Sequence, residues 1–155
     1  MQPASSRAFL AAALLAAPFF CAPASACTIS SAGVAFGAYN PQSAANDDST
    51  GTVTLACAPT VTAPVVALST GGSGTYSPRR MTNGAFNLNY NLYTTAARTV
   101  IWGNGIGGTV TQTLTGGTVS GGIRNFSRTI YGRAPGSQNI GAGAYLDTIT
   151  LTVTF

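Results

Sequence analysis

Hydrophobic and polar residues alternate most regularly in the C-terminal segment of the chain. One face of residues 148–155 is apolar, and the other face consists of threonines. A period of two is typical of a strand with one buried face, so residues 145–155 are predicted to form one long β-strand. Such a strand would span roughly 36 Å at about 3.3 Å per residue, and its apolar face must be covered. The apolar positions are Ile149, Leu151, Val153 and Phe155.

Shorter segments of the same kind alternate with glycine-rich turns along the rest of the chain. The clearest is Phe86–Tyr93, in which apolar residues and asparagines take turns. No stretch has the period of an amphipathic helix. The pattern therefore predicts an all-β sandwich or barrel. Further strands are predicted at residues 29–36, 50–57, 64–69, 99–102, 109–114 and 126–133, and turns at 71–74, 83–84, 104–105, 116–117, 121–122 and 135–136.

The N-terminal segment has the pattern of an export signal. Arg7 supplies a positive start, residues 9–20 form an apolar run, and Ala24-Ser25-Ala26 is a small-x-small cleavage site. The run is shorter than the ~20 residues that a membrane helix needs. We therefore expect a secretory signal peptide over residues 1–26 and one mature domain over residues 27–155, with no membrane span, exported to the periplasm or beyond.

Two cysteines, Cys27 and Cys57, remain in the mature domain, while Cys21 leaves with the signal. Two cysteines allow only one pairing, and the periplasm is oxidising, so a disulfide is favoured over two free thiols. A bridge closing a loop of about thirty residues stabilises a fold by ~3–4 kcal/mol in the chain-entropy model.

Charged side chains are scarce: they make up 6% of the residues, against ~25% in ordinary soluble proteins. The chain contains no histidine, lysine or glutamate, and its only side-chain carboxylates are Asp47, Asp48 and Asp147. A Ser-His-Asp triad is excluded without histidine, and a zinc site would need the cysteines. Two adjacent aspartates in a polar loop favour solvation over calcium binding. We expect no enzymatic activity, no cofactor and no metal.

The remaining charges also weigh against nucleotides and nucleic acids. Six arginines are scattered through the mature domain without the basic run that nucleic-acid binding needs. Residues 103–108 match the pattern GxGxxG, but a strand-forming segment follows them instead of a helix whose N-terminus could bind phosphate.

Three single residues carry expectations of their own. Asp147 takes an inward position, so its carboxylate should be paired or hydrogen-bonded, for example to Arg133. Arg79 and Arg80 are expected on the surface of a loop, and Trp102 in the core or in a turn.

Taken in order along the chain, several short motifs are together specific for one family. The mature chain resembles the spore coat protein U domain family, which includes subunits of archaic chaperone–usher pili. The motifs cover nearly all of the mature chain. They are residues 36–41 (FGAYNP), 50–57 (TGTVTLAC), 68–72 (LSTGG), 79–81 (Arg-Arg-Met), 88–93 (LNYNLY), 102–105 (WGNG), 131–133 (YGR) and 145–148 (YLDT).

The resemblance implies an immunoglobulin-like β-sandwich that lacks its final strand. In such subunits a periplasmic chaperone lends the missing strand, and the N-terminal extension of a neighbouring subunit later replaces it. An incomplete sandwich exposes apolar side chains and unpaired backbone groups, which β-strand addition covers. The acceptor groove is predicted to be lined by Val34, Phe36, Ile149, Leu151, Val153 and Phe155. The partners implied are a chaperone, an usher and neighbouring subunits, with roles in attachment and biofilm.

One departure from the family pattern leaves alternatives open. Predicted cleavage places Cys27 at the mature N-terminus, so no donor segment would precede it. The protein would then accept a strand without donating one, donate another segment such as residues 29–36, or complete its own sandwich as a free-standing envelope or coat protein. A further alternative is a small outer-membrane β-barrel, because a C-terminal phenylalanine after alternating apolar residues is typical of barrels.

Overall fold

The computed structural model describes residues 26–155, which fold into nine strands and one short 3₁₀-helix. Within these residues no helix is long and apolar enough to cross a membrane. The predicted signal peptide lies outside the described residues, apart from Ala26. The elements are β1 Cys27–Ala32, β2 Asp47–Cys57, β3 Val65–Leu68, η1 Gly71–Ser73, β4 Arg79–Asn83, β5 Phe86–Tyr93, β6 Gln112–Thr113, β7 Thr118–Ser120, β8 Ile123–Ala134 and β9 Leu151–Thr154.

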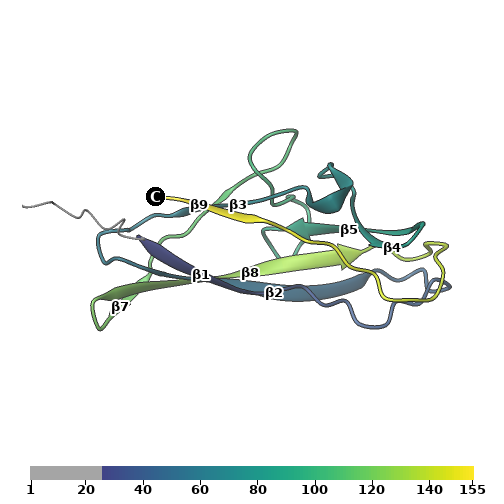
Figure 1. The fold of residues 1–155 in the computed structure, drawn as a ribbon, viewed down its shortest axis with the longest axis horizontal. Coiled ribbons are helices and arrows are strands. Elements are labelled where there is room, and N and C mark those ends of the chain that lie inside the picture. The colour runs from purple at the N-terminus through teal and green to yellow at the C-terminus, as the bar shows by residue number, and fades with distance from the viewer. Residues whose placement is uncertain (1–25) are drawn as a thin grey trace, which may run out of the picture.

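The strands form two sheets that pack on one another as a sandwich. The first sheet has the order β1-β2-β8-β5-β4, with β7 added beside β8, and the second has the order β6-β3-β9. Figure 1 shows β9, in yellow, beside β3 in the upper layer, with β1, β2 and β8 below. The predicted all-β sandwich is confirmed.

The longest ladder joins β2 and β8 and supplies much of the core. Their antiparallel register runs from Asp47 opposite Ala134 to Cys57 opposite Arg124. Val53 and Leu55 of β2 are 0% exposed, while the adjacent Thr52 and Thr54 point to the other face. The buried side chains of both strands pack against those of β3 and β5 and against Trp102, and burying each large aliphatic side chain stabilises the fold by about 1.5–3 kcal/mol.

The predicted turns at residues 83–84 and 121–122 close two hairpins. In the hairpin of β7 and β8, Ser120 lies opposite Ile123, so that Gly121 and Gly122 form a two-residue loop. Both glycines have positive φ, 56° and 76°. Two positive φ values define the type I′ turn, whose twist matches that of the strands.

The prediction of one long strand over residues 145–155 is wrong in extent. Only Leu151–Thr154 form a ladder, because the neighbouring strand β3 ends at Leu68, opposite Leu151. The alternation itself is real: half-buried and exposed residues follow one another from Tyr145 to Thr154. We call residues 145–155 the C-terminal arm.

Residues 99–102 and 109–114 are also less regular than predicted. Their pairings outside β6 are isolated bridges, Tyr93 with Ile101 and Trp102 with Val110. The loop between them contains Gly105, Gly107 and Gly108, all at positive φ. Backbone in this conformation turns away from an extended ladder, so the two segments meet only briefly.

Candidate functional site

A groove lies between the C-terminal arm and the segment that follows β1. Its central part is a cavity of about 220 Å³. Residues 31–36 contribute one lip, the arm contributes the other, and core side chains form the floor. The lips are lined by Val34 and Phe36 on one side and by Tyr145, Leu146, Asp147, Ile149 and Leu151 on the other, and the floor by Leu68, Met81, Tyr90, Leu92 and Ile130.

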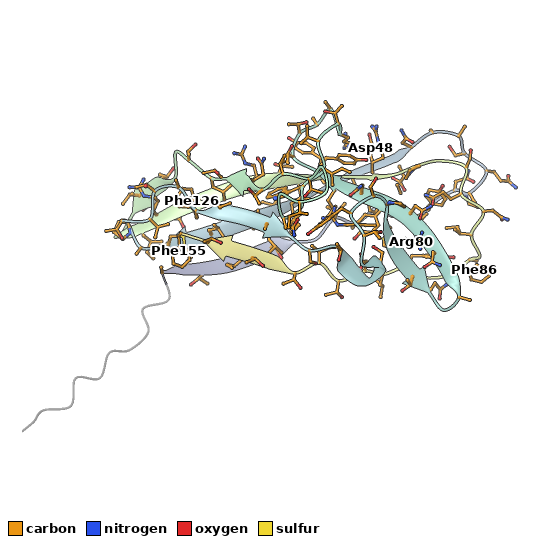
Figure 2. The ribbon with its side chains drawn as sticks, turned by 90° about the horizontal axis from the view of Figure 1, so that it is seen from above. Asp48, Arg80, Phe86, Phe126 and Phe155 are labelled. Atoms are coloured by element: carbon orange, nitrogen blue, oxygen red, sulfur yellow. A yellow bond between two sulfur atoms is a disulfide. The ribbon has the colours of Figure 1, made fainter. Side chains whose placement is uncertain are left out.

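The groove widens toward one end of the sandwich. A second cavity of about 680 Å³ continues from Val34 and Phe36 to the segments 37–41 and 140–146. Leu146, which lines both cavities, is 74% exposed. Nearby Phe86 is 53% exposed, and its ring lies beside Gly141, where a Cβ atom would come within 3.0 Å of Phe86 Cε2. In Figure 2, Phe86 lies at this end and Phe155 near the other.

Two glycines of the long ladder explain why the first lip leaves the sheet edge after Ala32. A Cβ atom at Gly132 of β8 would come within 2.5 Å of Val34 Cγ1 and 2.9 Å of Phe36 Cζ. A Cβ atom at Gly51 of β2 would meet the Ala32 carbonyl oxygen at 2.6 Å. The missing side chains leave room for residues 32–36 to cross the inner face. This crossing shortens the predicted strand 29–36 to Cys27–Ala32.

The two lips contact the same floor but are not joined by their backbones. Phe36 packs edge-on against the Tyr90 ring, with centroids 5.9 Å apart. No backbone–backbone hydrogen bond links residues 33–39 to residues 143–151 of the described chain. Within the described residues β9 pairs only with β3, on the side away from the groove, so it is an edge strand of this sheet. One row of its backbone groups therefore faces the groove.

Separate hydrogen bonds hold the unpaired part of the arm in an extended form. Leu146 and Thr82 exchange two backbone bonds, of 2.9 and 3.2 Å. The Ser69 amide donates to the Thr150 carbonyl oxygen at 3.0 Å, and the Thr150 amide donates to Ser69 Oγ at 2.9 Å. These contacts replace the ladder where β3 has ended.

Asp147 provides the third attachment of the arm. Its Oδ1 accepts hydrogen bonds from the Gly72 and Thr148 amides, both at 2.8 Å, and its Oδ2 accepts one from the Tyr90 hydroxyl at 2.6 Å. Gly71, at φ 69°, is needed here because a Cβ atom would overlap the carboxylate. The expectation that the Asp147 carboxylate is hydrogen-bonded is therefore confirmed, but Arg133, the partner suggested as an example, is not among its partners. Arg133 instead forms two 2.7 Å hydrogen bonds with the Asp48 carboxylate.

Burial shifts the pKa values of Tyr90, in the groove floor, and of Arg79. It raises the pKa of Tyr90, and the hydrogen bond to Asp147 raises that pKa further. It lowers the pKa of Arg79, whose side chain is 0% exposed. The expectation that Arg79 lies on the surface is therefore wrong. Its guanidinium donates to the carbonyl oxygens of Ser69 and Trp102 and to Asn91 Oδ1, so backbone acceptors take the place of a carboxylate.

The predicted groove residues fall into two groups in the structure. Val34, Phe36, Ile149 and Leu151 line the central cavity. Val153 is half-buried and packs on the core without lining either cavity of the groove, and Phe155 is 64% exposed and lines neither. The groove is also lined by Met81 of β4, Tyr90 of β5 and Leu146, which were not predicted. Only the tertiary fold brings these residues, which are distant in sequence, to the groove.

Cys27 and Cys57 form a disulfide, as expected from the sequence. The two residues lie directly opposite one another in the register of β1 and β2. The bond therefore fixes the start of β1 to the end of the β2–β8 ladder. Trp102 is 0% exposed, which confirms its expected place in the core, and its indole donates to the Val66 carbonyl oxygen.

Comparisons with known proteins point to one family and one fold. The profile of the Spore Coat Protein U domain matches residues 11–152. A similar solved structure is a chain of the CsuC-CsuE chaperone–tip adhesion subunit pre-assembly complex from the archaic chaperone-usher Csu pili of Acinetobacter baumannii. A search of curated proteins found no match.

The structural likeness has a TM-score of 0.56 at 21% sequence identity and covers 83% of this chain. It covers 39% of the other chain, so this chain spans about two-fifths of that neighbour's length. At this identity the likeness shows a shared fold, in agreement with the predicted immunoglobulin-like sandwich.

Proposed function

The chain belongs to the Spore Coat Protein U domain family, and on that premise we propose that it is a structural subunit of an archaic chaperone–usher pilus, completed by a β-strand from another polypeptide. The observation that carries this proposal is the groove beside the edge strand β9. Its lips carry the half-buried apolar side chains of Val34, Phe36, Ile149 and Leu151, and within residues 26–155 no backbone hydrogen bond crosses the gap between the lips.

Strand addition accounts for both properties of the groove at once. A strand inserted between the lips would hydrogen-bond to the free edge of β9, and every second side chain would point to the floor. Ile149 and Leu151 would then lose their contact with water. An open apolar groove with unpaired backbone promotes aggregation, so the proposed subunit needs a partner before assembly.

The partners follow from the likeness to the Csu complex, whose title names a chaperone and a tip adhesion subunit. We infer that a periplasmic chaperone fills the groove first, and that a neighbouring subunit replaces it at the usher. The proposed location is the periplasm during export and the cell surface afterwards. Its role there would be structural or adhesive, in attachment and biofilm, and not enzymatic.

The direct test is periplasmic expression with and without a chaperone of the archaic class, followed by sizing of the product. We expect multimers or aggregates from the protein alone and a one-to-one complex with the chaperone. A stable monomer without the chaperone would contradict the proposal and favour the free-standing envelope protein.

Two adjacent residues of the arm give a matched pair of variants. Ile149→Asp places a charge in the groove and should abolish the chaperone complex. Thr150→Asp makes a similar change on the exposed face and should preserve it. Equal yields of complex from both variants would argue against strand binding in this groove.

A further inference from the structure

The chain contains two Asn-Gly pairs, Asn83-Gly84 and Asn104-Gly105, and the structure places them in different surroundings. In such a pair the side chain of the asparagine can react with the backbone nitrogen that follows it, because glycine has no side chain to block the approach. Asn83 is the last residue of β4, whereas Asn104 is exposed in the loop that follows Trp102. The two pairs therefore provide an internal comparison of the same chemistry.

The loop of residues 103–109 is fixed at its base and exposed at its tip. The Gly103 amide donates a hydrogen bond to the Val110 carbonyl oxygen at 2.8 Å. Thr109 is 6% exposed, and its amide and its hydroxyl both donate to the Ile106 carbonyl oxygen, at 3.3 and 2.9 Å. Residues 104–108 are exposed to solvent. Water therefore reaches the reactive pair, while hydrogen bonds hold the loop around it.

One of these hydrogen bonds activates the side chain of Asn104. The Ile106 amide donates to Asn104 Oδ1 at 3.0 Å. This Asx turn folds the side-chain carbonyl group back toward the intervening amide of Gly105. The same donor would stabilise the negative charge that develops on Oδ1 when a nucleophile adds to Cγ, as the donors of an oxyanion hole do.

A second hydrogen bond orients the nucleophile. The Gly105 amide donates to Thr109 Oγ1 at 3.2 Å. Because this hydroxyl gives its own proton to the Ile106 carbonyl oxygen, one of its lone pairs faces the Gly105 amide. The amide must lose its proton before its nitrogen attacks, and an acceptor in line with the N–H bond favours that loss. Both reacting groups therefore have the hydrogen-bond partner that the reaction needs.

The Asn83 pair lacks both features. Asn83 Nδ2 donates to the Ala142 carbonyl oxygen at 3.5 Å, and a Cβ atom at Gly143 would overlap it. Within residues 26–155, neither Asn83 Oδ1 nor the Gly84 amide has a hydrogen-bond partner. Asn83 also pairs with Phe86 in the β4–β5 ladder, which restrains its backbone. The side chain of Asn83 is thus held against another segment and not over the amide that follows it.

We propose that Asn104 is a self-modifying site, which loses its amide group through a succinimide. The Gly105 nitrogen forms a bond to Asn104 Cγ, the Cγ–Nδ2 bond breaks, and a proton returns to Nδ2, which leaves as ammonia. Water then opens the ring at one of its two carbonyl carbons and gives aspartate or isoaspartate. The product carries a negative charge beside Ile106, whose side chain is 70% exposed. The loop lines neither cavity of the groove, so this inference is independent of strand addition.

The test is incubation of the protein, alone or with a strand partner, in mildly alkaline buffer, followed by peptide mapping for aspartate and isoaspartate at both sites. We expect Asn104 to deamidate at least fivefold faster than Asn83 in the folded protein. In the urea-unfolded protein the two sites should react within twofold of one another, because the fold no longer distinguishes them. Equal rates in the folded protein, or a preference for Asn104 that persists in urea, would overturn the proposal.

Variants at Thr109 test the hydrogen bond to the nucleophile. Thr109→Val removes the acceptor and should slow the deamidation of Asn104 at least threefold, whereas Thr109→Ser keeps the hydroxyl and should stay within twofold of the parent protein. Thr111→Val is a control, since the Thr111 hydroxyl forms no hydrogen bond within residues 26–155, and it should also stay within twofold. Unchanged or faster deamidation in Thr109→Val would refute the role of this hydroxyl.

Discussion

The β2–β8 ladder and the C-terminal arm are built on the same alternation of apolar and polar residues, yet they differ in completeness. In the ladder the inward residues Val53 and Leu55 are 0% exposed. In the arm the equivalent residues Ile149 and Leu151 are only half-buried. The difference lies in their neighbours. Each ladder strand has a paired strand along its length, whereas the arm has one short partner and an open side.

This contrast shows that alternation determines which residues face inward but not whether anything covers them. Burial requires a second segment of matching length, and residues 26–155 supply one for the ladder but not for the arm. The same sequence pattern thus marks core in one place and a proposed binding surface in the other.

The largest effect is expected from truncating one leucine in each region. Leu55→Ala should lower the free energy of unfolding by about 2–5 kcal/mol, because it leaves a cavity in a packed core. Leu151→Ala should cost about 1 kcal/mol in the isolated chain, because much of its side chain is already in water. Denaturant unfolding measures both.

A bound strand should erase this difference between the leucines. If Leu151 is covered by a partner strand, its truncation should cost about as much as that of Leu55 when the complex is unfolded. A Leu151→Ala penalty that stays the same with and without a partner would show that the groove is not filled at this position.

A smaller loss of stability is expected where residues 32–36, the lip opposite the arm, cross the β2–β8 ladder. Gly132→Ala should destabilise the protein by about 1–3 kcal/mol, because the new methyl group would meet Val34 and Phe36. Gly33→Ala is the control, since a Cβ atom there has no neighbour within 4 Å and its φ needs no glycine. Equal losses of thermal stability in the two variants would contradict the close passage of Val34 and Phe36 over Gly132.

The smallest effect concerns the attachment of the arm through Tyr90 and Asp147. Burial and this hydrogen bond raise the pKa of Tyr90, whereas a tyrosine in the unfolded chain ionises near pH ~10. Above that pH the unfolded state binds fewer protons than the folded state. Tyr90 should therefore lower the free energy of unfolding by about 1.4 kcal/mol for each further pH unit. Below pH ~9 the contribution is constant.

Tyr90→Phe should remove this part of the alkaline slope. The free energies of unfolding of the variant and the parent protein should be measured between pH 8 and 11. Their difference separates the contribution of Tyr90, expected to change by ~1 kcal/mol over this range, from that of the other tyrosines. Parallel curves would show that Tyr90 titrates alike in both states.

The sequence predicted the regular parts of this fold because their signals are local. Phe86–Tyr93 is a strand with the predicted bounds, and the glycine turn at residues 121–122 closes a hairpin. Charge pairing was not predictable in the same way. Arg133 was suggested for Asp147 as one example of an arginine partner, but the partners of Asp147 include a backbone amide and a phenol, which no charge pattern marks.

The candidate site was predictable only where its residues alternate. The period of two predicts Ile149 and Leu151 as groove residues. Met81 is brought to the groove by the short strand β4, and Leu146 by its single bridge to Thr82, which the sequence pattern does not indicate. The crossing of the first lip depends on Gly51 and Gly132, whose role is the absence of a side chain. The sequence shows these glycines but not what passes over them.

The disulfide at the first residue of β1 also determines how the domain would transmit mechanical load. β1 is bonded to β2 alone, and a pull on its N-terminal end would otherwise unzip its backbone bonds one pair at a time. With Cys27 joined to Cys57, tension enters the longest ladder through a covalent bond and is shared as shear among many pairs. Reducing agents should therefore lower the force that unfolds the domain in a single-molecule pulling experiment.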